Sequence, residues 1–423
     1  MKIEFTRYTT MCITIVSLCL MPCCKQPDDP QPDENVLSVT PVSSLYFNAD
    51  NNVADTLDVS TDADSWHYDT PDWVIAEKCE NRLIVNVADN SGDMRQGVIA
   101  ITAGNAPKVE IAVCQKAHRS IKQIVYIEVN DCNPLNILEY NLADGTPFFD
   151  AVILFAANIN YDAASDRVYL HCNANVQALL DESDTYLQPL RERGIKVYLG
   201  ILGNHDTAGV AQLSDWGAQQ WAQEVAEVCR VYKLDGVNLD DEYSKAPDLE
   251  NKWFAKPSAA AGARLAYELK AVLAQKCSWH TEVSIFEYGA LYRLPGVTVD
   301  GVKHTQSEFI DMVLANYGCE AYPYGDLTFS HCSGASIELN SGIKLYKSTA
   351  QNALKQGYGW CMWFAFNPSG SCGSRNNREH AMEQFNMAAD VFYNTEMAQP
   401  SKVYNKVGEG VFDPQPYAIM EQE

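Results

Sequence analysis

The order of apolar and polar residues divides the chain at about residue 118. Residues 37–117 consist of short segments in which apolar and polar side chains alternate, as at Leu83, Val85 and Val87. Asp, Asn and Gly separate these segments every 8–12 residues or so, and no helical period runs through them. Because successive side chains of a strand point to opposite faces, the pattern predicts an all-β sandwich over residues 37–117.

Residues 118–423 show a different pattern. Continuous apolar runs, typical of strands that are buried on both faces, alternate with amphipathic stretches. Eight such runs favour a (β/α)8 barrel over an open sheet, which makes the chain a multidomain protein. The runs are 123–130, 149–160, 195–202, 234–243, 281–289, 309–318, 334–339 and 357–366, with helices predicted over 175–193, 215–232, 258–275, 347–356 and 378–391.

Residues 1–24 have the features of a secretory signal peptide. A basic start precedes an apolar stretch over 11–21, which is too short to cross a membrane as a helix. The stretch runs into Cys23 and Cys24 and resembles a bacterial lipoprotein processing box, so we expect a lipid on one of them. Ordinary secretion with two incidental cysteines is the alternative. Residues 25–36, rich in Pro and Asp, predict a tether that holds the protein at the outer surface of a bacterium.

Charge and cysteine spacing narrow the range of partners. With 31 basic and 55 acidic residues the formal charge is −24, which disfavours nucleic acid and anionic membrane faces but not a neutral sugar. Membrane contact is therefore expected through the lipid anchor alone. The cysteines beyond the leader have no Cys-x-x-Cys spacing, which argues against a metal and leaves one or two disulfides open. No glycine-rich nucleotide motif is present, so we expect no cofactor.

The fourth apolar run carries the candidate chemistry. On a strand, Asn238, Asp240 and Glu242 share one face, which points into the barrel if Val237 and Leu239 face the helices. Two carboxyl groups this close do not both ionise readily, so one keeps its proton. A glutamic acid that stays protonated near neutral pH serves as a general acid for a glycosidic oxygen. The alternative is a solvated acidic strand end.

The segment DGVNLDDE, residues 235–242, closely resembles the Asp-Gly-x-x-x-Asp-x-Glu motif of glycoside hydrolase family 18. Chitinases of that family usually have an aromatic residue between the last two acids. This chain has Asp241 there, as in the endo-β-N-acetylglucosaminidases of the Endo H and Endo F type. Segments elsewhere in the second domain resemble the same branch in the same order, namely 126–130, 142–162, 169–177, 193–205 and 357–359.

The resemblance implies roles for individual residues. Glu242 takes the place of the catalytic acid and base, Asp240 that of the aspartate that holds the substrate's acetamide, and Tyr317 that of a tyrosine that donates to the acetamide carbonyl. Asp235 and Gly236 match the structural start of the motif, and Asn238 departs from the aspartate of many members. Four residues are expected to contact substrate: Asn158, Asn204, Asn238 and Trp363, although Trp363 fills the core in an equally weighted alternative.

The implied reaction is cleavage inside the chitobiose core of N-linked glycans, of the high-mannose or hybrid class, by a monomer without metal or cofactor. Retention of configuration follows from a substrate-assisted mechanism, the known exception to the two-carboxylate scheme. Three alternatives remain: a chitinase, a glycan-binding lipoprotein without activity, and a surface scaffold in which the sandwich binds glycan.

The sandwich resembles the BACON domain of Bacteroidetes secreted proteins. The shared features are Trp66 before a strand, the Pro-Asp-Trp sequence at 71–73 and the closing segment 91–115. The aromatic rings of Trp66, Tyr68 and Trp73 either stack on a sugar or belong to the core of a spacer. We favour the spacer.

Overall fold

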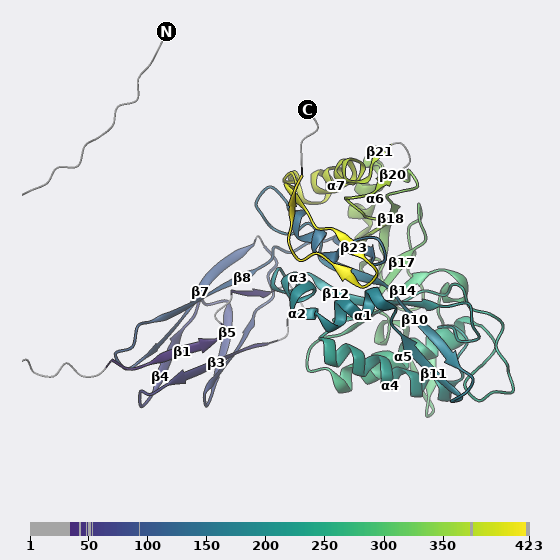
Figure 1. The fold of residues 1–423 in the computed structure, drawn as a ribbon, viewed down its shortest axis with the longest axis horizontal. Coiled ribbons are helices and arrows are strands. Elements are labelled where there is room, and N and C mark those ends of the chain that lie inside the picture. Colours follow the sequence, from purple (N-terminus) through teal and green to yellow (C-terminus); the bar gives the residue numbers. More distant parts are fainter. Residues whose placement is uncertain are drawn as a thin grey trace, which may run out of the picture.

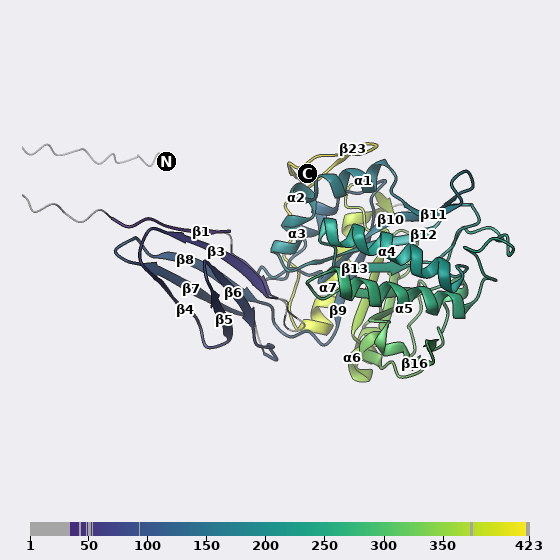
Figure 2. The same cartoon turned by 90° about the horizontal axis from the view of Figure 1, so that it is seen from below.

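The computed structural model describes residues 34–41, 44–47, 49, 52, 54–92, 94–372 and 375–419. The predicted signal peptide, Cys23, Cys24 and most of the tether lie outside the described residues. Figures 1 and 2 show a β-domain at one end of the molecule and a larger α/β domain at the other. Among the described helices, none is long and apolar enough to cross a membrane.

The β-domain consists of two four-stranded sheets with a hydrophobic core between them. The alternating segments predicted over residues 37–117 form the eight strands β1 to β8. Trp66 is buried in the core beneath the Lys78 ammonium, and Trp73 packs against the same cluster. These two rings therefore serve the core rather than an exposed sugar platform. One sheet has the order β1 (Leu37–Thr40), β3 (Asp55–Thr61), β6 (Arg82–Val87), β5 (Val74–Cys79), and the other β2 (Leu45–Phe47), β8 (Val109–Gln115), β7 (Arg95–Ala103), β4 (Trp66–Asp69).

The eight apolar runs form the eight parallel strands of a barrel, as predicted. The last strand pairs with the first, and a parallel bridge from Val313 to Cys332 links the sixth strand to the start of the seventh, so the barrel is nearly closed. In chain order the strands are β9 (Lys122–Glu128), β10 (Ala151–Asp162), β12 (Lys196–Gly203), β13 (Gly236–Leu239), β14 (Glu282–Glu287), β17 (Met312–Ala315), β18 (Ser333–Glu338) and β19 (Trp360–Phe364).

The helices depart from a regular (β/α)8 arrangement. The helix predicted over 175–193 breaks into α1 (Ala174–Asp181), α2 (Ser183–Tyr186) and α3 (Gln188–Glu192), where Pro189 removes a backbone donor. The other predicted helices appear as α4 (Asp215–Tyr232), α5 (Ala259–Lys276), α6 (Lys347–Gln356) and α7 (Asn377–Tyr393). Strands β9, β14 and β17 are followed by 3-10 turns instead of α-helices: η1 (Pro134–Glu139), η2 (Gly289–Leu291), η3 (Gln306–Glu308) and η4 (Phe329–His331).

Short antiparallel pairs decorate the barrel. Strand β11 (Arg167–His171) folds back on the end of β10, and a hairpin of β15 (Val297–Val299) and β16 (Val302–His304) lies between β14 and β17. Near the C-terminus, β22 (Lys402–Val403) pairs with β25 (Tyr417–Ala418), and β23 (Lys406–Gly408) pairs with β24 (Val411–Phe412). Strands β20 (Ser371–Cys372) and β21 (Arg375–Asn376) pair just before α7.

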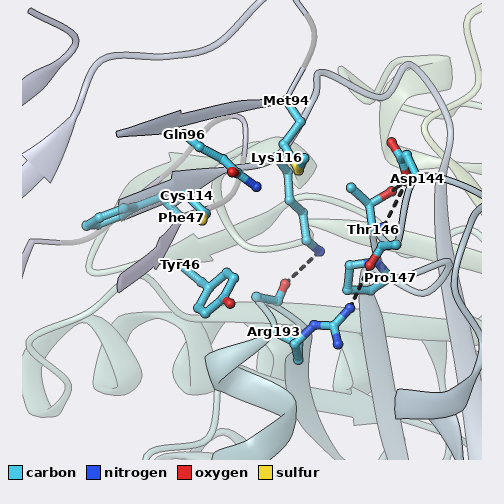
Figure 3. Close-up of a pocket in the computed structure, with 12 residues that line it drawn as sticks. Tyr46, Phe47, Met94, Gln96, Cys114, Lys116, Asp144, Thr146, Pro147 and Arg193 are labelled. Atoms are coloured by element: carbon cyan, nitrogen blue, oxygen red, sulfur yellow. Dashed lines mark hydrogen bonds between the residues drawn. The ribbon is translucent and has the colours of Figure 1, made fainter. Parts of the chain in front are cut away.

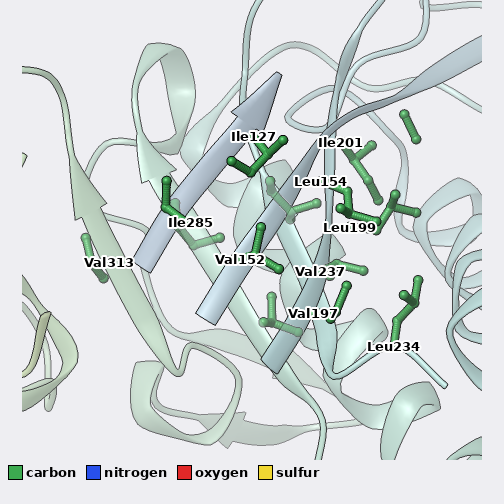
Figure 4. Close-up of a cluster of buried hydrophobic side chains, with 14 of the residues drawn as sticks. Ile127, Val152, Leu154, Val197, Leu199, Ile201, Leu234, Val237, Ile285 and Val313 are labelled. Atoms are coloured by element: carbon green, nitrogen blue, oxygen red, sulfur yellow. The ribbon is translucent and has the colours of Figure 1, made fainter. Parts of the chain in front are cut away.

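Side-chain alternation along the strands creates two apolar layers. The outer layer lies between the strands and the helices, and Figure 4 shows Leu154, Leu199, Val237 and Ile285 in it. The inner layer fills the barrel and holds Ile124, Ile153, Tyr198, Met312 and Met362 among its members. A filled interior leaves the ends of the barrel as the places where polar side chains gather.

The β-domain docks at the end of the barrel where the strands begin. The Lys116 ammonium donates to the Gly194 carbonyl at 2.8 Å and lies 3.5 Å from the Asp150 carboxylate. Arg119 pairs with the same carboxylate at 3.1 Å. Figure 3 shows the adjoining pocket of about 210 Å³, with Tyr46 on the β-domain side and Arg193 on the barrel side. This junction lies at the opposite end of the barrel from Asp240 and Glu242, which follow the end of β13.

Candidate active site

Asp235 and Gly236 lie where β13 begins. Gly236 has a φ of 148°, and a Cβ there would lie 1.9 Å from the Glu282 carbonyl oxygen, so the neighbouring strand leaves no room for another residue. The Asp235 carboxylate accepts a hydrogen bond from the Val197 amide at 2.7 Å. Both residues therefore fix strand spacing at the amino end and are remote from the barrel mouth.

Asn238 points into the barrel, and Val237 and Leu239 pack in the outer layer, as alternation predicted. Its side-chain oxygen accepts from the Tyr126 hydroxyl at 2.9 Å, and its amide nitrogen donates to the Ser284 hydroxyl at 2.9 Å. Asn238 is fully buried, so this network fixes the wall of the site below the mouth. Contact between Asn238 and a substrate is not what this geometry favours.

The strand itself is shorter than predicted, because β13 ends at Leu239 and the acids follow it. Their backbone nevertheless continues the contact with β12. The Asp240 amide donates to the Ile201 carbonyl at 3.0 Å, and the Gly203 amide donates to the Glu242 carbonyl at 3.1 Å. The two carboxyl groups are thus held on a rigid edge of the barrel although no regular strand contains them.

Asp240 is buried, with 4 % of its surface exposed, and its Oδ1 accepts no hydrogen bond from any described residue. Burial, and then the charges of Glu242 and Asp241, raise the pKa of Asp240 well above its ordinary value. Glu242 is partly exposed at the mouth, beside this buried acid.

Five aromatic rings form a floor inside the mouth: Tyr126, Phe155, Phe286, Tyr317 and Phe364. The Tyr317 ring lies 5.0 Å from that of Phe364 and 5.6 Å from that of Phe286. Burial, and then the charge of Asp240, raise the pKa of Tyr317 well above its ordinary value. Tyr317 is therefore a neutral hydroxyl in the electrostatic range of Asp240, which suits the role implied by the resemblance.

The substrate-contact prediction for Trp363 is wrong. The indole is fully buried in the outer layer, and its Nε1 donates to the Gln123 side chain at 2.8 Å. The neighbouring Phe364 faces the mouth instead. The alternative of core filling, stated for Trp363 above, is the one that the structure supports.

Asn158 and Asn204 lie at the mouth on different segments of the chain. Asn158 belongs to β10, and its amide nitrogen donates to the Gly203 carbonyl at 3.2 Å. Asn204 directly follows Gly203 in the chain and is exposed. It lies beside the segment that holds Glu242, because the Gly203 amide donates to the Glu242 carbonyl. Asn160, which the sequence did not single out, shares the face of Asn158, and its buried Oδ1 has no partner among the described residues.

Three further acids at the mouth escaped the sequence interpretation. Glu128, Glu287 and Glu338 are the last residues of β9, β14 and β18. Burial, and then Asp131 and Glu338, raise the pKa of Glu128, and burial raises that of Glu287. Each acid ends an apolar run, which was the available signal, because such a residue in a barrel lies at the mouth.

Asp241 has a separate structural contact. Its carboxylate accepts from the Ala290 amide at 2.8 Å, and a Cβ at Gly289 would come within 2.6 Å of it. Asp241 thus holds the turn that follows β14 against the mouth. Among the described residues, no three His, Cys, Asp or Glu side chains gather in a way that would hold a metal ion. Every cysteine whose side chain is described is a free thiol.

No protein-family model matches the chain. Endo-beta-N-acetylglucosaminidase F1 of Elizabethkingia meningoseptica is 38 % identical over 299 residues, which cover 70 % of this chain and 85 % of that protein. The endo-beta-N-acetylglucosaminidase of a Flavobacterium strain is 47 % identical over 122 residues, or 29 % of this chain and 38 % of that one. The crystal structure of EndoBT-3987 from Bacteroides thetaiotaomicron with a Man9GlcNAc2Asn substrate is 36 % identical, with a TM-score of 0.64, over 90 % of this chain and 99 % of that one. The chain therefore belongs to the endo-β-N-acetylglucosaminidases.

Proposed function

We propose that this protein hydrolyses the β-1,4 bond between the two N-acetylglucosamines of the N-glycan core and leaves one of them on asparagine. The observation that carries the proposal is the pair of Asp240 and Glu242 over an aromatic floor. Asp240 is buried with one oxygen that has no partner among the described residues, and Glu242 is partly exposed. The relative EndoBT-3987 has been solved in complex with a Man9GlcNAc2Asn substrate and with a Man5GlcNAc product. High-mannose glycans are therefore the proposed substrates.

The proposed mechanism assigns one step to each group. Glu242 donates a proton to the oxygen between the two sugars while the substrate's own acetamide oxygen attacks the anomeric carbon. Asp240 and Tyr317 hold the acetamide and stabilise the oxazolinium ion that forms. Glu242, now ionised, takes a proton from the water that opens the ring, so configuration is retained and each proton is returned. These are the roles that the resemblance to glycoside hydrolase family 18 implies.

A glycopeptide with one high-mannose glycan tests the reaction. The wild type should release an oligosaccharide with one reducing N-acetylglucosamine and leave a peptide that is heavier by one N-acetylglucosamine, as measured by mass spectrometry of both products. A bare peptide with aspartate in place of asparagine, or no change in either mass, would refute the proposal.

A preformed sugar oxazoline tests the mechanism. The Asp240→Asn variant should hydrolyse the glycopeptide slowly yet still consume oxazoline, because the intermediate need not be generated. A covalent sugar adduct on Asp240 of the wild type would instead indicate a nucleophilic carboxylate.

Two competing functions are weaker. A binding protein without activity has no need of a buried acid beside Glu242, since a buried carboxyl oxygen that accepts no hydrogen bond costs stability. A chitinase is disfavoured by Asp241, whose contact with the Ala290 amide brings the turn after β14 to the mouth. Hydrolysis of soluble chitin oligomers at the rate of the glycopeptide would favour the chitinase.

The wider setting is also a proposal. We infer that a lipid on Cys23 or Cys24 anchors the protein, as a monomer, to the bacterial surface, that the segment 37–117 is a BACON-type spacer, and that the boundary at 118 separates two folding units. Stable anchoring needs more than one acyl chain. Mass spectrometry of the native N-terminus tests the anchor, and an unmodified first residue would refute it.

A further inference from the structure

Between the two domains lies a cavity that the proposed reaction does not use. It has a volume of about 210 Å³ and lies at the end of the barrel opposite Asp240 and Glu242. Ligand sites are found preferentially at domain interfaces. The volume is about seven times that of one water molecule in the liquid, which leaves room for one small organic molecule. We call this space the junction cavity, and its lining includes Tyr46, Phe47, Lys116, Asp144, Pro147 and Arg193.

The β-domain supplies an aromatic wall of the junction cavity. Tyr46 pairs with Cys114 in the register of β2 and β8, and Gln96 pairs with Cys114 in that of β7 and β8. Because directly paired residues share one face of a sheet, these three side chains form a row on the face that lines the cavity. Tyr46 is 41 % exposed, so its ring offers apolar surface that a ligand can cover.

The segment after β8 supplies a buried cation. The Lys116 ammonium donates to the Gly194 carbonyl at 2.8 Å and lies 3.5 Å from the Asp150 carboxylate. Its position is also fixed from the β-domain, because the Lys116 amide donates to the Phe47 carbonyl at 3.0 Å. An ammonium has three N–H donors, and these two partners use two of them. The third donor remains for a group inside the cavity that Lys116 lines.

The charge of Lys116 is only partly balanced by its surroundings. Burial is the main cause that lowers the pKa of Lys116 to about 8; the Asp150 charge raises the pKa, and the charges of Arg119 and Lys122 lower it. An anion in the junction cavity would therefore stabilise the charged form of Lys116. The charged groups around Lys116 come from the starts of β9, β10 and β12 and from the end of α3: Arg119, Lys122, Asp150, Lys196 and Arg193.

The barrel supplies a second cation at the same end of the cavity. Arg193 directly precedes Gly194, whose carbonyl accepts from Lys116, and Figure 3 shows the guanidinium group beside the Lys116 ammonium. The Arg193 Nη2 donates to the Asn141 side chain and to the Gly145 carbonyl, both at 2.8 Å, which fixes the guanidinium plane. A guanidinium has five N–H donors, and those on Nε and Nη1 reach no described residue.

One carboxylate lies among the described lining residues, and its Oδ1 is engaged within its own turn. The Asp144 Oδ1 accepts from the Thr146 amide at 2.9 Å and from the Thr146 hydroxyl at 2.7 Å. Two cations thus accompany one carboxylate in this lining, although the formal charge of the whole protein is −24. A local surplus of positive charge beside an aromatic ring suits an organic anion, because hydrogen bonds between cations and carboxylates are strong.

We propose that the junction cavity binds a small organic carboxylate, with the carboxylate group on Lys116 and Arg193 and the apolar body of the ligand against Tyr46. Lys116 belongs to the β-domain side and Arg193 to the barrel, so one ligand bridges both domains. Its binding stabilises the docked arrangement by mass action. The proposal goes beyond chitobiose cleavage and does not depend on it, because the cavity lies at the opposite end of the barrel from the candidate active site.

Calorimetry with benzoate and with benzamide, its neutral counterpart of the same shape, tests the site on the full chain. At pH 7 the wild type should bind benzoate about tenfold more tightly than benzamide, on the scale of one hydrogen bond to a charged group. Arg193→Met keeps an apolar stem and removes the charge, so the ratio of the two affinities should fall toward one. Lys108→Met, which removes an exposed lysine of the β-domain, is the matched control and should leave both affinities unchanged.

The pH dependence of benzoate binding tests Lys116 separately. The Lys116 ammonium loses its proton as the pH rises through about 8, whereas a guanidinium stays charged. Benzoate affinity of the wild type should therefore fall between pH 7 and pH 9.5, because the bound carboxylate favours the protonated lysine. In Lys116→Met the affinity should be lower at pH 7 and equal at both pH values. This variant should fold, because Asp150 keeps its pair with Arg119 at 3.1 Å.

Crystals that contain 4-bromobenzoate locate the site directly. The anomalous bromine signal should lie in the junction cavity, and benzoate should leave turnover of the glycopeptide unchanged. No saturable binding, equal affinities for benzoate and benzamide, unchanged binding in both Arg193→Met and Lys116→Met, or a bromine signal only at the barrel mouth would each overturn the proposal. A wild type that binds benzoate as described but does not cleave the glycopeptide would refute the proposed function alone and leave the junction site supported.

Discussion

The two ends of the barrel bury carboxyl groups in opposite ways. At the amino end, Asp150 pairs with Arg119 at 3.1 Å and Glu282 pairs with Lys196 at 2.7 Å. Burial opposes ionisation there, but the cations outweigh it and lower the pKa of both acids. At the carboxyl end, Asp240 and Glu287 each bury one oxygen that has no partner among the described residues, and burial raises the pKa of both.

The two ends of the barrel both bury carboxyl groups, and they differ in whether a cation compensates the buried charge. Asp311, at the amino end, also has a raised pKa because burial comes first, yet it pairs with Lys270 at 2.7 Å and accepts from the Val283 amide. An isolated buried carboxyl group costs stability, and a fold retains it where its chemistry is used. The amino end therefore holds the barrel and the β-domain together, and the carboxyl end is organised for reaction.

The largest expected effect is on catalysis at the carboxyl end. Glu242→Gln keeps the shape of the side chain but cannot deliver a proton, so kcat on a high-mannose glycopeptide should fall by about 10²–10⁴-fold. Glycan binding should persist, because the amide fills the same space. Glu192→Gln, on the exposed surface of α3, is the control and should keep full activity. A near-normal rate for Glu242→Gln would show that another group is the acid.

The next largest effect is expected at the amino end of the barrel, where a substitution lowers the stability of the fold. Gly236→Ala places a Cβ 1.9 Å from a carbonyl oxygen and strains a backbone with a φ of 148°, so the free energy of unfolding should fall by about 3–5 kcal/mol. Gly357→Ala also has a positive φ, of 79°, but nothing lies within 4 Å of its Cβ. It should cost about 1 kcal/mol. Equal losses in urea unfolding of the two variants would remove the close approach at Gly236 as the cause.

A smaller effect is expected when the pH is lowered, because the ion-paired acids at the amino end then take up protons. Asp150 and Glu282 have lowered pKa values in the folded protein, against ordinary values of 3.8 and 4.5. The unfolded chain therefore binds their protons first, and the stability that they contribute is present above those ordinary values and is lost as pH falls through the folded ones. Urea midpoints should drop from about pH 5 downward, and Asp150→Asn should flatten that drop. A free energy of unfolding that rises as the pH falls would contradict the claim that cations stabilise the ionised forms of Asp150 and Glu282.

Hydrophobic pattern was enough to predict the strands of both domains and the position of the acids. Sixteen apolar or alternating segments became the strands of the two folds, because burial on one or both faces leaves a pattern that is local in sequence. The orientation of Asn238 followed from its apolar neighbours Val237 and Leu239. The same reasoning placed the acids at the mouth.

The sequence did not predict the features that depend on contacts between distant segments. The run 357–366 is apolar throughout, so its pattern does not indicate that Trp363 faces outward and Phe364 inward. The partner that the Asp240 oxygen lacks, and the hairpin β23–β24 beside the mouth, depend on neighbours far along the chain. Glu128, Glu287 and Glu338 were visible as strand ends, but their shared location required the closed barrel.

The most direct test of the account measures stability and turnover together for Asp150→Asn and Asp240→Asn at pH 7. Asp150→Asn leaves Arg119 and Lys116 buried without their anion, so it should lose about 3–5 kcal/mol of stability while the folded fraction still cleaves the glycopeptide. Asp240→Asn removes an uncompensated acid, so its stability should stay within about 1 kcal/mol of the wild type or rise, while turnover collapses. An Asp240→Asn variant as destabilised as Asp150→Asn, with normal turnover, would contradict the claim that the carboxyl end holds its buried acid for chemistry.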